Sequence, residues 1–205
     1  LKNLNFKFKK GSIYSLSGPS GSGKSTLLNL LSLIDRPSSG NIKIDKHNID
    51  HNKIEDNDKI RSNNIGIVYQ EKNLLPDFTA LENVCLASLA INNNHKIAEQ
   101  ESLKIIQKVG LKDRINHFPS ELSGGELQRI AISRAIVNKP RIILADEPTG
   151  SLDHENANQI FNLLFKLKNK DRVIIFATHN RFFANKADYK IYLRNGKIKI
   201  INGKI

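Results

Sequence analysis

The chain has 205 residues, which is enough for one domain with a full core or for one domain with a subdomain. Its formal net charge is +12, but the lysines are scattered and lack interleaved aromatic residues. Nucleic-acid binding or an anionic membrane surface could explain this charge, but we attribute it to a lysine- and asparagine-biased composition and expect no nucleic-acid partner. A single cysteine excludes an intrachain disulfide, and no apolar stretch could span a membrane, so the sequence predicts a soluble, cytoplasmic protein.

The beginning of the chain predicts two strands and a helix. Leu4, Phe6 and Phe8 alternate with polar residues, as in a half-buried strand. Since this strand begins at Leu1 rather than at a methionine, we expect further residues upstream. Residues 13–17 form a second strand-like run. Apolar residues then recur at helical spacing, at Leu27, Leu30, Leu31 and Ile34.

Between the second strand and the helix lies a glycine-rich segment that fits the phosphate-loop pattern G-x-x-x-x-G-K-[ST]: Gly18, Pro19, Ser20, Gly21, Ser22, Gly23, Lys24, Ser25 and Thr26. Glycines let backbone N–H groups point at phosphate oxygens, and the helix dipole adds positive potential. Lys24 can reach the β- and γ-phosphates, and the Ser25 hydroxyl can bind Mg²⁺. The alternative, a turn that only caps a helix, is disfavoured by this lysine–serine pair. A Rossmann site is excluded because the third glycine is missing.

The middle of the chain predicts a helical insertion. A strand at 42–44 precedes a polar segment with a possible short helix at 54–61, and the apolar strand 65–69 ends at Gln70. Thr79 and Glu82 form a capping box that opens a helix. A second helix ends near Gly110. Residues 74–120 are thus mostly helical, whereas the flanks alternate strand and helix, which indicates an α/β fold with an insertion.

The second half of the chain carries two acidic residues after a buried strand. Residues 142–145 form a continuous apolar run, as in a central parallel strand, followed by Asp146, Glu147 and Pro148. Asp146 can hold Mg²⁺, usually through water, and Glu147 can accept a proton from an attacking water. Pro148 keeps Glu147 out of helical geometry, so we expect a sharp turn. Without the phosphate loop upstream, two solvated acids in a turn would be an equal alternative.

A second glycine pair opens a helix further along. Ser123 and Glu126 form a capping box before the apolar stripe of residues 127–135. Gly124 and Gly125 could also expose N–H groups to an anion, which gives the chain two candidate phosphate sites where one ATP needs one. The residues alone do not explain why the chain has a second candidate phosphate site. A helical stripe at 160–167, a buried strand at 173–177 and a hairpin at 189–201 complete the chain.

The motifs, in chain order, resemble those of the ATP-binding subunits of ABC transporters: residues 18–25, Gln70, residues 122–126, residues 142–147, residues 151–153 and His179. The resemblance covers essentially the whole chain. It implies a P-loop NTPase (RecA-like) core of the ABC ATPase type, with a helical insertion and an antiparallel β part. The chain would be a single domain, with its α/β core at about 1–73 and 129–205 and a helical subdomain at about 74–128.

This resemblance also implies roles for the motif residues. Two subunits would form a head-to-tail homodimer that binds ATP and Mg²⁺ between the phosphate loop of one and the signature sequence of the other: Leu122, Ser123, Gly124, Gly125 and Glu126. Glu147, His179 and Gln70 would be catalytic, and Ser25, Gln70 and Asp146 would hold Mg²⁺. Asp153 would lie at the dimer seam. Leu127 and Asn180 depart from the commonest family residues, and the aromatic residue that stacks on adenine would precede Leu1.

Two segments narrow the resemblance within the family. Residues 74–84 and 116–122 resemble the lipoprotein-releasing ATPases, which implies LolC/LolE-like permease subunits and a place on the cytoplasmic face of the bacterial inner membrane. Macrolide-exporter and cell-division (FtsE-like) ATPases remain alternatives. Soluble ABC proteins that act on DNA or ribosomes are disfavoured, because they usually carry two such domains or a long coiled-coil insertion, and neither fits in 205 residues. We expect the apolar loop 71–78 to be the docking surface for the membrane subunit.

Overall fold

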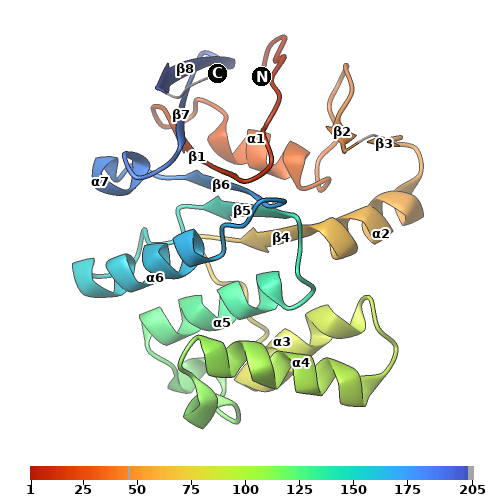
Figure 1. Ribbon diagram of the computed structural model, residues 1–205, viewed down its shortest axis with the longest axis vertical. Helices are drawn as coiled ribbons and strands as arrows, with labels where there is room; N and C mark the ends of the chain where they lie inside the picture. Colours follow the sequence, from red (N-terminus) through yellow and green to blue (C-terminus); the bar gives the residue numbers. More distant parts are fainter. Residues whose placement is uncertain (46, 203–205) are drawn as a thin grey trace.

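The computed structural model describes residues 1–45 and 47–202, and Figure 1 shows them as alternating strands and helices. Two short 3₁₀ helices span Lys112–Arg114 and Pro119–Glu121. The strands and longer helices are β1 (Ser12–Ser17), α1 (Lys24–Leu31), β2 (Lys43–Ile44), β3 (His47–Asn48), α2 (Ile54–Asn64), β4 (Ile65–Val68), α3 (Ala80–Leu89), α4 (His95–Lys108), α5 (Gly124–Ile136), β5 (Ile142–Asp146), α6 (His154–Lys166), β6 (Val173–Ala177), α7 (Arg181–Ala184), β7 (Tyr189–Arg194) and β8 (Lys197–Asn202).

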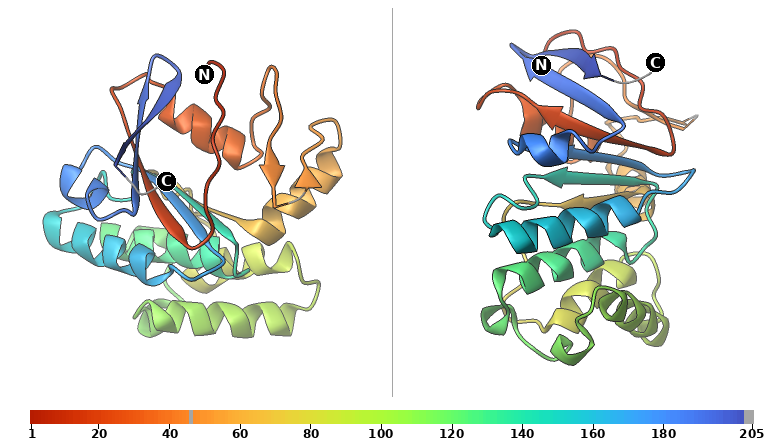
Figure 2. Two further views of the ribbon diagram at one scale, coloured as in Figure 1. Left: turned by 45° about the horizontal axis from the view of Figure 1, so that its top comes forward. Right: turned by 60° about the vertical axis from the view of Figure 1, so that its left-hand side comes forward.

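The main sheet has the strand order β4-β5-β6-β1-β7-β8 (Figure 2). All neighbouring pairs from β4 to β7 are parallel, and only β7 and β8 are antiparallel. Parallel strands that are buried on both faces are continuously apolar, as β6 is along its whole length. The final hairpin turns at Asn195 and Gly196, which both have positive φ, as a two-residue turn requires. The α/β class and the terminal hairpin are therefore confirmed.

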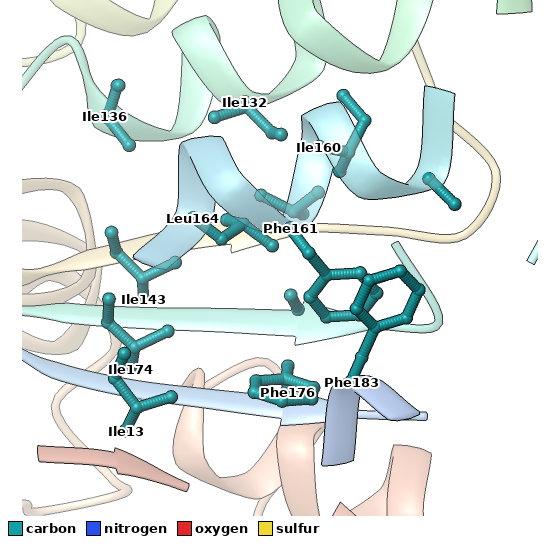
Figure 3. Close-up of a cluster of buried hydrophobic side chains, with 13 residues drawn as sticks. Ile13, Ile132, Ile136, Ile143, Ile160, Phe161, Leu164, Ile174, Phe176 and Phe183 are labelled. Atoms are coloured by element: carbon teal, nitrogen blue, oxygen red, sulfur yellow. The ribbon is translucent and has the colours of Figure 1, made fainter. Parts of the chain in front are cut away.

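Helices cover the sheet on both faces. On one face, α5 and α6 bury a cluster that includes Ile132, Ile160 and Phe161 (Figure 3). The ring of Phe161 stacks on that of Phe183 from α7, with the ring centres 3.8 Å apart. On the other face, α1 contributes Leu27 and Leu28 to a separate cluster. α1 and α5 therefore lie on opposite faces of the sheet, so the residues at the start of one helix are separated from those at the start of the other.

The helical insertion has its own small core. α3 and α4 pack together and against α5 around a third apolar cluster that contains Val84, Ile106 and Ile130. α3 begins with the expected capping box of Thr79 and Glu82, and Gly110 follows α4 with φ +77°. The boundary expected near residue 128 falls within α5. In the described part of the chain, no helix is long and apolar enough to cross a membrane.

The strand expected at the start of the chain was wrong. The described residues before β1 form no strand, although Leu4, Phe6 and Phe8 are partly buried in alternation. They cover the aromatic cluster around Tyr14 instead, where the ring of Phe8 meets that of Tyr14 at 4.9 Å, so ring packing rather than a ladder of hydrogen bonds holds this segment. The helix expected at 54–61 is confirmed: α2 begins at Ile54 and extends three residues further, to Asn64.

The helix after the phosphate loop also ends earlier than predicted. α1 stops at Leu31, and Leu33 turns the chain with φ +60°. Ile34, which the helical spacing placed on the apolar stripe, is therefore 47% exposed. Leu28 and Leu33 fill the buried positions in its place. The prediction for Ile34 failed because the apolar spacing continues past the turn at which the helix ends.

Candidate active site

Four separate motifs meet at one edge of the sheet. The phosphate loop follows β1, Gln70 follows β4, Asp146 and Glu147 end β5, and His179 follows β6. These strands are parallel and adjacent, in the order β4-β5-β6-β1, so their carboxyl ends lie side by side. The carboxyl edge of a parallel sheet is the usual ligand site of such folds. Residues 161 positions apart in sequence, from Gly18 to His179, thus share one surface.

The phosphate loop depends on its glycines. Gly18, Gly21 and Gly23 have φ of 152°, 73° and 98°, a region that other residues adopt with strain. A Cβ at Gly18 would collide with the carbonyl oxygen of Leu193 and lie 2.8 Å from Ser22 Oγ. Gly23 is the N-cap of α1, so the loop leads directly into the positive end of that helix, as the sequence predicted.

Lys24 folds back over the loop that precedes it. Its ammonium donates to the carbonyl oxygens of Gly18 at 3.0 Å and Pro19 at 3.1 Å, and its side chain is buried. A buried ammonium with only neutral acceptors gains when an anionic oxygen replaces one of them. Ser22 Oγ is also buried, with no hydrogen-bond partner among the described residues. Both features fit a phosphate group in the loop.

Glu147 occupies a strained position at the tip of β5. Its N–H donates to the carbonyl oxygen of Ala177 at 3.1 Å, which fixes the backbone next to β6. Its φ is +43°, so the expectation that Pro148 keeps it out of helical geometry is confirmed, although the residue is left-handed rather than extended. Strain of this kind at a non-glycine residue is concentrated at functional sites.

The Glu147 carboxylate is only 16% exposed and faces His179, whose Nε2 lies 3.5 Å from Oε1. That distance leaves Oε1 without a hydrogen bond from the described residues. Burial raises the pKa of Glu147, opposed by the nearby His179, whereas the charge of Asp146 raises it further. The carboxylate is therefore a better proton acceptor than an exposed glutamate, and its Oε1 is left free by the described residues to accept a proton from a water.

Gln70 and the segment after it lie beside the acidic turn. A Cβ at Gly150 would come within 3.1 Å of Gln70 Nε2, so this glycine makes room for the amide. The ammonium of Lys72 donates to Ser151 Oγ at 2.7 Å. The loop after β4 is thus joined to the loop after β5 on the same side of the sheet. No sequence signal singled out Lys72, because its partner is 79 residues away.

The helix α5 holds the same loop from the other side. Gln128 is fully buried and donates to the carbonyl oxygen of Tyr69 at 3.4 Å. The guanidinium of Arg134 donates to the carbonyl oxygens of Lys72 at 2.9 Å and Asn73 at 2.7 Å. Sequence analysis missed both residues, since a polar residue on a helix gains meaning only from what it contacts. Together they attach the segment after β4 to the helix that begins with the signature sequence.

Asn83 fixes the rest of that loop. Its side chain is 1% exposed, accepts from the N–H of Leu75 at 2.8 Å, and donates to the carbonyl oxygens of Leu75, Phe78 and Thr79. Leu75 and Phe78 are 45% and 38% exposed, as the sequence predicted, whereas Leu74 packs against the core of the insertion. The loop therefore presents two apolar side chains on a backbone held by one buried amide.

The signature sequence forms the capped start of α5. Ser123 accepts from the N–H of Glu126, and the Glu126 carboxylate accepts from the N–H of Ser123 at 2.8 Å. This hydrogen bond from the Ser123 backbone, with a second one from the Arg114 guanidinium, lowers the pKa of Glu126 to about 2. Ser123 and Gly124 are exposed. Because α1 and α5 cover opposite faces of the sheet, the chain does not bring its own signature to its own phosphate loop.

Asp153 caps α6 in the same manner. Its Oδ1 accepts from the N–H of Asn156 at 2.9 Å, and its Oδ2 accepts from the side-chain amide of Asn156 at 2.6 Å. The N–H of Asn156 is the main reason why the pKa of Asp153 is lowered. The carboxylate is exposed and charged beside a helix N-terminus, which is favourable electrostatically.

A metal ion in this site would need ligands beyond the protein. Among the described residues, no group of three histidine, cysteine or acidic side chains could hold a metal. Ser25 and Asp146 offer one hydroxyl and one carboxylate at the sheet edge. This sparse set suits Mg²⁺, which keeps waters and takes substrate phosphates as its other ligands.

Comparison with known proteins agrees with this geometry. A family model described as "ABC transporter" matches residues 1–150. The ABC transporter ATP-binding protein YvrO of Bacillus subtilis is 43% identical over 97% of this chain and 86% of its own length. The lipoprotein-releasing system ATP-binding protein LolD of Ehrlichia canis is 48% identical over 91% and 84%. LolD of Rickettsia bellii is 41% identical over 98% and 89%.

A solved structure gives the same result for the fold. The ATP-binding cassette MJ0796, as a dimer in a post-hydrolysis state with ADP and Pi, superposes with a TM-score of 0.89. It is 37% identical and covers 100% of this chain and 91% of its own length. The fold is that of the P-loop NTPases, with the phosphate loop, the acidic turn and the signature helix described above. The chain therefore belongs to the ABC transporter family and is an ATP-binding subunit that hydrolyses ATP.

Proposed function

We propose that two copies of this chain form a head-to-tail dimer that closes on ATP and drives a membrane complex for lipoprotein release. One observation carries the proposal: the signature at the start of α5 lies on the face of the sheet opposite to α1 and its phosphate loop. A second copy would supply the signature that each phosphate loop lacks. The dimeric cassette MJ0796 supports this arrangement by similarity.

Within each site, this chain would bind the nucleotide through the phosphate loop. The Lys24 ammonium exchanges its two carbonyl acceptors for oxygens of the β- and γ-phosphates. The N-terminus of α1 and the loop N–H groups stabilise the same charge. Ser25, Gln70 and Asp146 would hold Mg²⁺, which neutralises the phosphate charge that develops during transfer.

Glu147 would orient the attacking water and accept its proton. Burial raises its pKa, and its carboxylate faces the His179 ring from a backbone position with positive φ. His179, 62% exposed, would contact the γ-phosphate beside Thr178 and Asn180. Gln70 next to Gly150 would register whether the phosphate is present, and would pass the change to the loop after β4.

The second copy would complete each site. Ser123 and Gly125, with neighbouring Leu122, Gly124 and Glu126, would meet the partner's γ-phosphate, and Asp153 would lie at the seam between the subunits. ATP would thus bind the dimer better than the monomer and favour closure by mass action. Hydrolysis would remove the shared phosphate and reopen the dimer.

Similarity to several LolD proteins supports lipoprotein release as the work performed. In this proposal the chain is one ABC ATPase domain, with an α/β core at about 1–73 and 129–205 and a helical subdomain at about 74–128. It sits on the cytoplasmic face of the inner membrane, where the loop 71–78 docks on LolC/LolE-like permease subunits. A macrolide-exporter or cell-division complex is the alternative.

Purification of the tagged chain from its own membranes tests the proposal. Integral membrane subunits should co-purify, and ATP hydrolysis by the complex in proteoliposomes should release a lipoprotein from the bilayer to a soluble acceptor. A matched preparation with Glu147→Gln should assemble but release nothing. Co-purification with a single cell-division membrane protein, without lipoprotein release, would replace the proposed complex by the alternative.

A further inference from the structure

The signature glycine Gly125 lies directly against the helix α6 of its own chain. A Cβ at this position would overlap the side-chain oxygen of Asn156 and lie 2.8 Å from its Cγ. Real Cβ atoms essentially never approach another atom so closely, so either the Asn156 side chain or one of the two helices would have to shift. Gly125 is buried, and its backbone is ordinary helix, so a need for conformational freedom does not explain the glycine. The lack of room for a side chain beside Asn156 explains it.

Asn156 cannot simply turn away from this contact. Its amide nitrogen donates to Asp153 Oδ2 at 2.6 Å, and its backbone N–H donates to Asp153 Oδ1 at 2.9 Å. With the nitrogen bound to Asp153, the amide oxygen faces Gly125. A neighbouring contact agrees: a Cβ at Gly124 would meet the side chain of Leu152 at 3.3 Å. The start of α5 therefore rests on the start of α6.

The contact continues along both helices. One turn further on, Arg129 of α5 donates to Gln159 Oε1 of α6 at 2.7 Å. Beyond that pair, apolar side chains fill the same interface, and Figure 3 shows Ile132, Ile160 and Leu164 in the layer where α5 faces α6. A polar layer at the helix starts thus precedes an apolar layer, which fixes the register of the two helices at both ends.

We propose that Asn156 is a positioning residue that holds the signature sequence in register with Asp153, so that the two dimer-forming segments of one chain move as a single body. Gly125 is glycine because Asn156 fills the space of its side chain, and not only because a partner's phosphate approaches its backbone. The proposal rests on the dimer proposed above. In such a dimer, Ser123 and Asp153 reach the partner together only while this register holds.

Two measurements on four variants test the proposal. Unfolding midpoints without nucleotide report the packing, and ATP-dependent dimerisation in a Glu147→Gln background reports the positioning. The variants are Gly125→Ala, Asn156→Ala, their combination, and Asn158→Ala as a matched control. Asn158 lies on the same helix, and its one side-chain hydrogen bond to a described residue is donated to the His154 carbonyl oxygen of its own turn, at 2.9 Å.

Gly125→Ala should lower the unfolding midpoint, and adding Asn156→Ala should restore most of the loss, because the two Cβ atoms then lie 3.5 Å apart, an ordinary contact. Asn156→Ala alone should raise the protein concentration needed for half-dimerisation at least tenfold, while ATP affinity of the monomer changes less than twofold. Asn158→Ala should leave both measurements unchanged. Asn156→Ser, which keeps a hydroxyl for Asp153 but empties the space at Gly125, should behave like Asn156→Ala and replaces it if the alanine variant does not fold.

Additive losses of stability in the double variant would show that Gly125 and Asn156 do not share this space, and would overturn the packing. Normal dimerisation of Asn156→Ala would overturn the positioning role. If the Glu147→Gln protein itself fails to dimerise with ATP, the proposed function is wrong instead. The stability measurements would still decide the packing in that case, so the two failures are distinguishable.

Discussion

Replacing Glu147 by glutamine removes the proposed proton acceptor while keeping the shape of the side chain. General base catalysis contributes about 10²–10⁴-fold to a rate, which corresponds to about 3–5 kcal/mol of barrier. The structure favours a large value here, because the carboxylate is 16% exposed, has a raised pKa and has no competing hydrogen bond on Oε1 from the described residues. We expect kcat to fall at least a hundredfold, with ATP affinity preserved.

The same substitution has a predictable effect on stability. Burial raises the pKa of Glu147 in the folded protein, so the charged form is less favourable there than in the unfolded chain. The wild-type protein therefore loses stability as pH rises from the unfolded pKa through the folded pKa, and stays penalised above it. Neutral glutamine carries no such penalty, so at pH 7 the variant should unfold at the same temperature or higher.

Turnover assays, calorimetric unfolding between pH 4 and 8, and light scattering with and without ATP-Mg measure these effects. The variant should become dimeric with ATP, and the isosteric change Glu55→Gln on the exposed start of α2 serves as control. A Glu147→Gln protein with more than a tenth of wild-type turnover would refute the assignment of the base. A variant that stays monomeric at high concentration with ATP would refute the shared site.

Four further predictions concern other parts of the molecule. Lys24→Ala should weaken ATP binding at least a hundredfold in a folded protein, because each charge-assisted contact contributes about 1.5–3 kcal/mol, and undiminished affinity in calorimetry would contradict it. Leu75→Ser with Phe78→Ser should keep basal hydrolysis but lose co-purification with, and stimulation by, the membrane subunit; normal assembly would disprove docking, and unfolding would show that these side chains serve packing. Ser123→Ala should reduce the free energy of unfolding by about 1 kcal/mol. Because the folded pKa of Glu126 is about 2, that capping box should hold above pH 4.5 and weaken as pH falls toward 2 in unfolding titrations.

Local patterns predicted the elements whose signals lie within one segment. The phosphate loop, the capping boxes at Thr79 and Ser123 and the apolar strand before Asp146 each carry their own geometry in consecutive residues. Parallel order followed from alternating strands and helices, and it brought the motifs to one edge. The helix end before Leu33 was missed because a single left-handed residue interrupts an apolar spacing that otherwise continues.

Residues that act across the fold escaped sequence analysis. Asn156, Arg134 and Asn83 look like ordinary polar residues on helices, and their partners are loops or helices up to 62 positions away. Their value comes from burial and from the backbone groups they satisfy, which no spacing rule encodes. At the N-terminus, sequence analysis predicted a strand that the structure lacks. Alternation like that of Phe6 and Phe8 suits any extended chain that lies against an apolar surface, whether or not it pairs with a strand.

The buried amide of Asn83 has a consequence for the speed and selectivity of assembly. Four hydrogen bonds hold the backbone from Leu75 to Thr79, so its conformational entropy is lost when the chain folds. A partner that meets Leu75 and Phe78 would find them already arranged and would not have to order the loop. The partner would then dock as a rigid body on a preformed surface. We expect such docking to be fast and to tolerate little change in the shape of the membrane subunit.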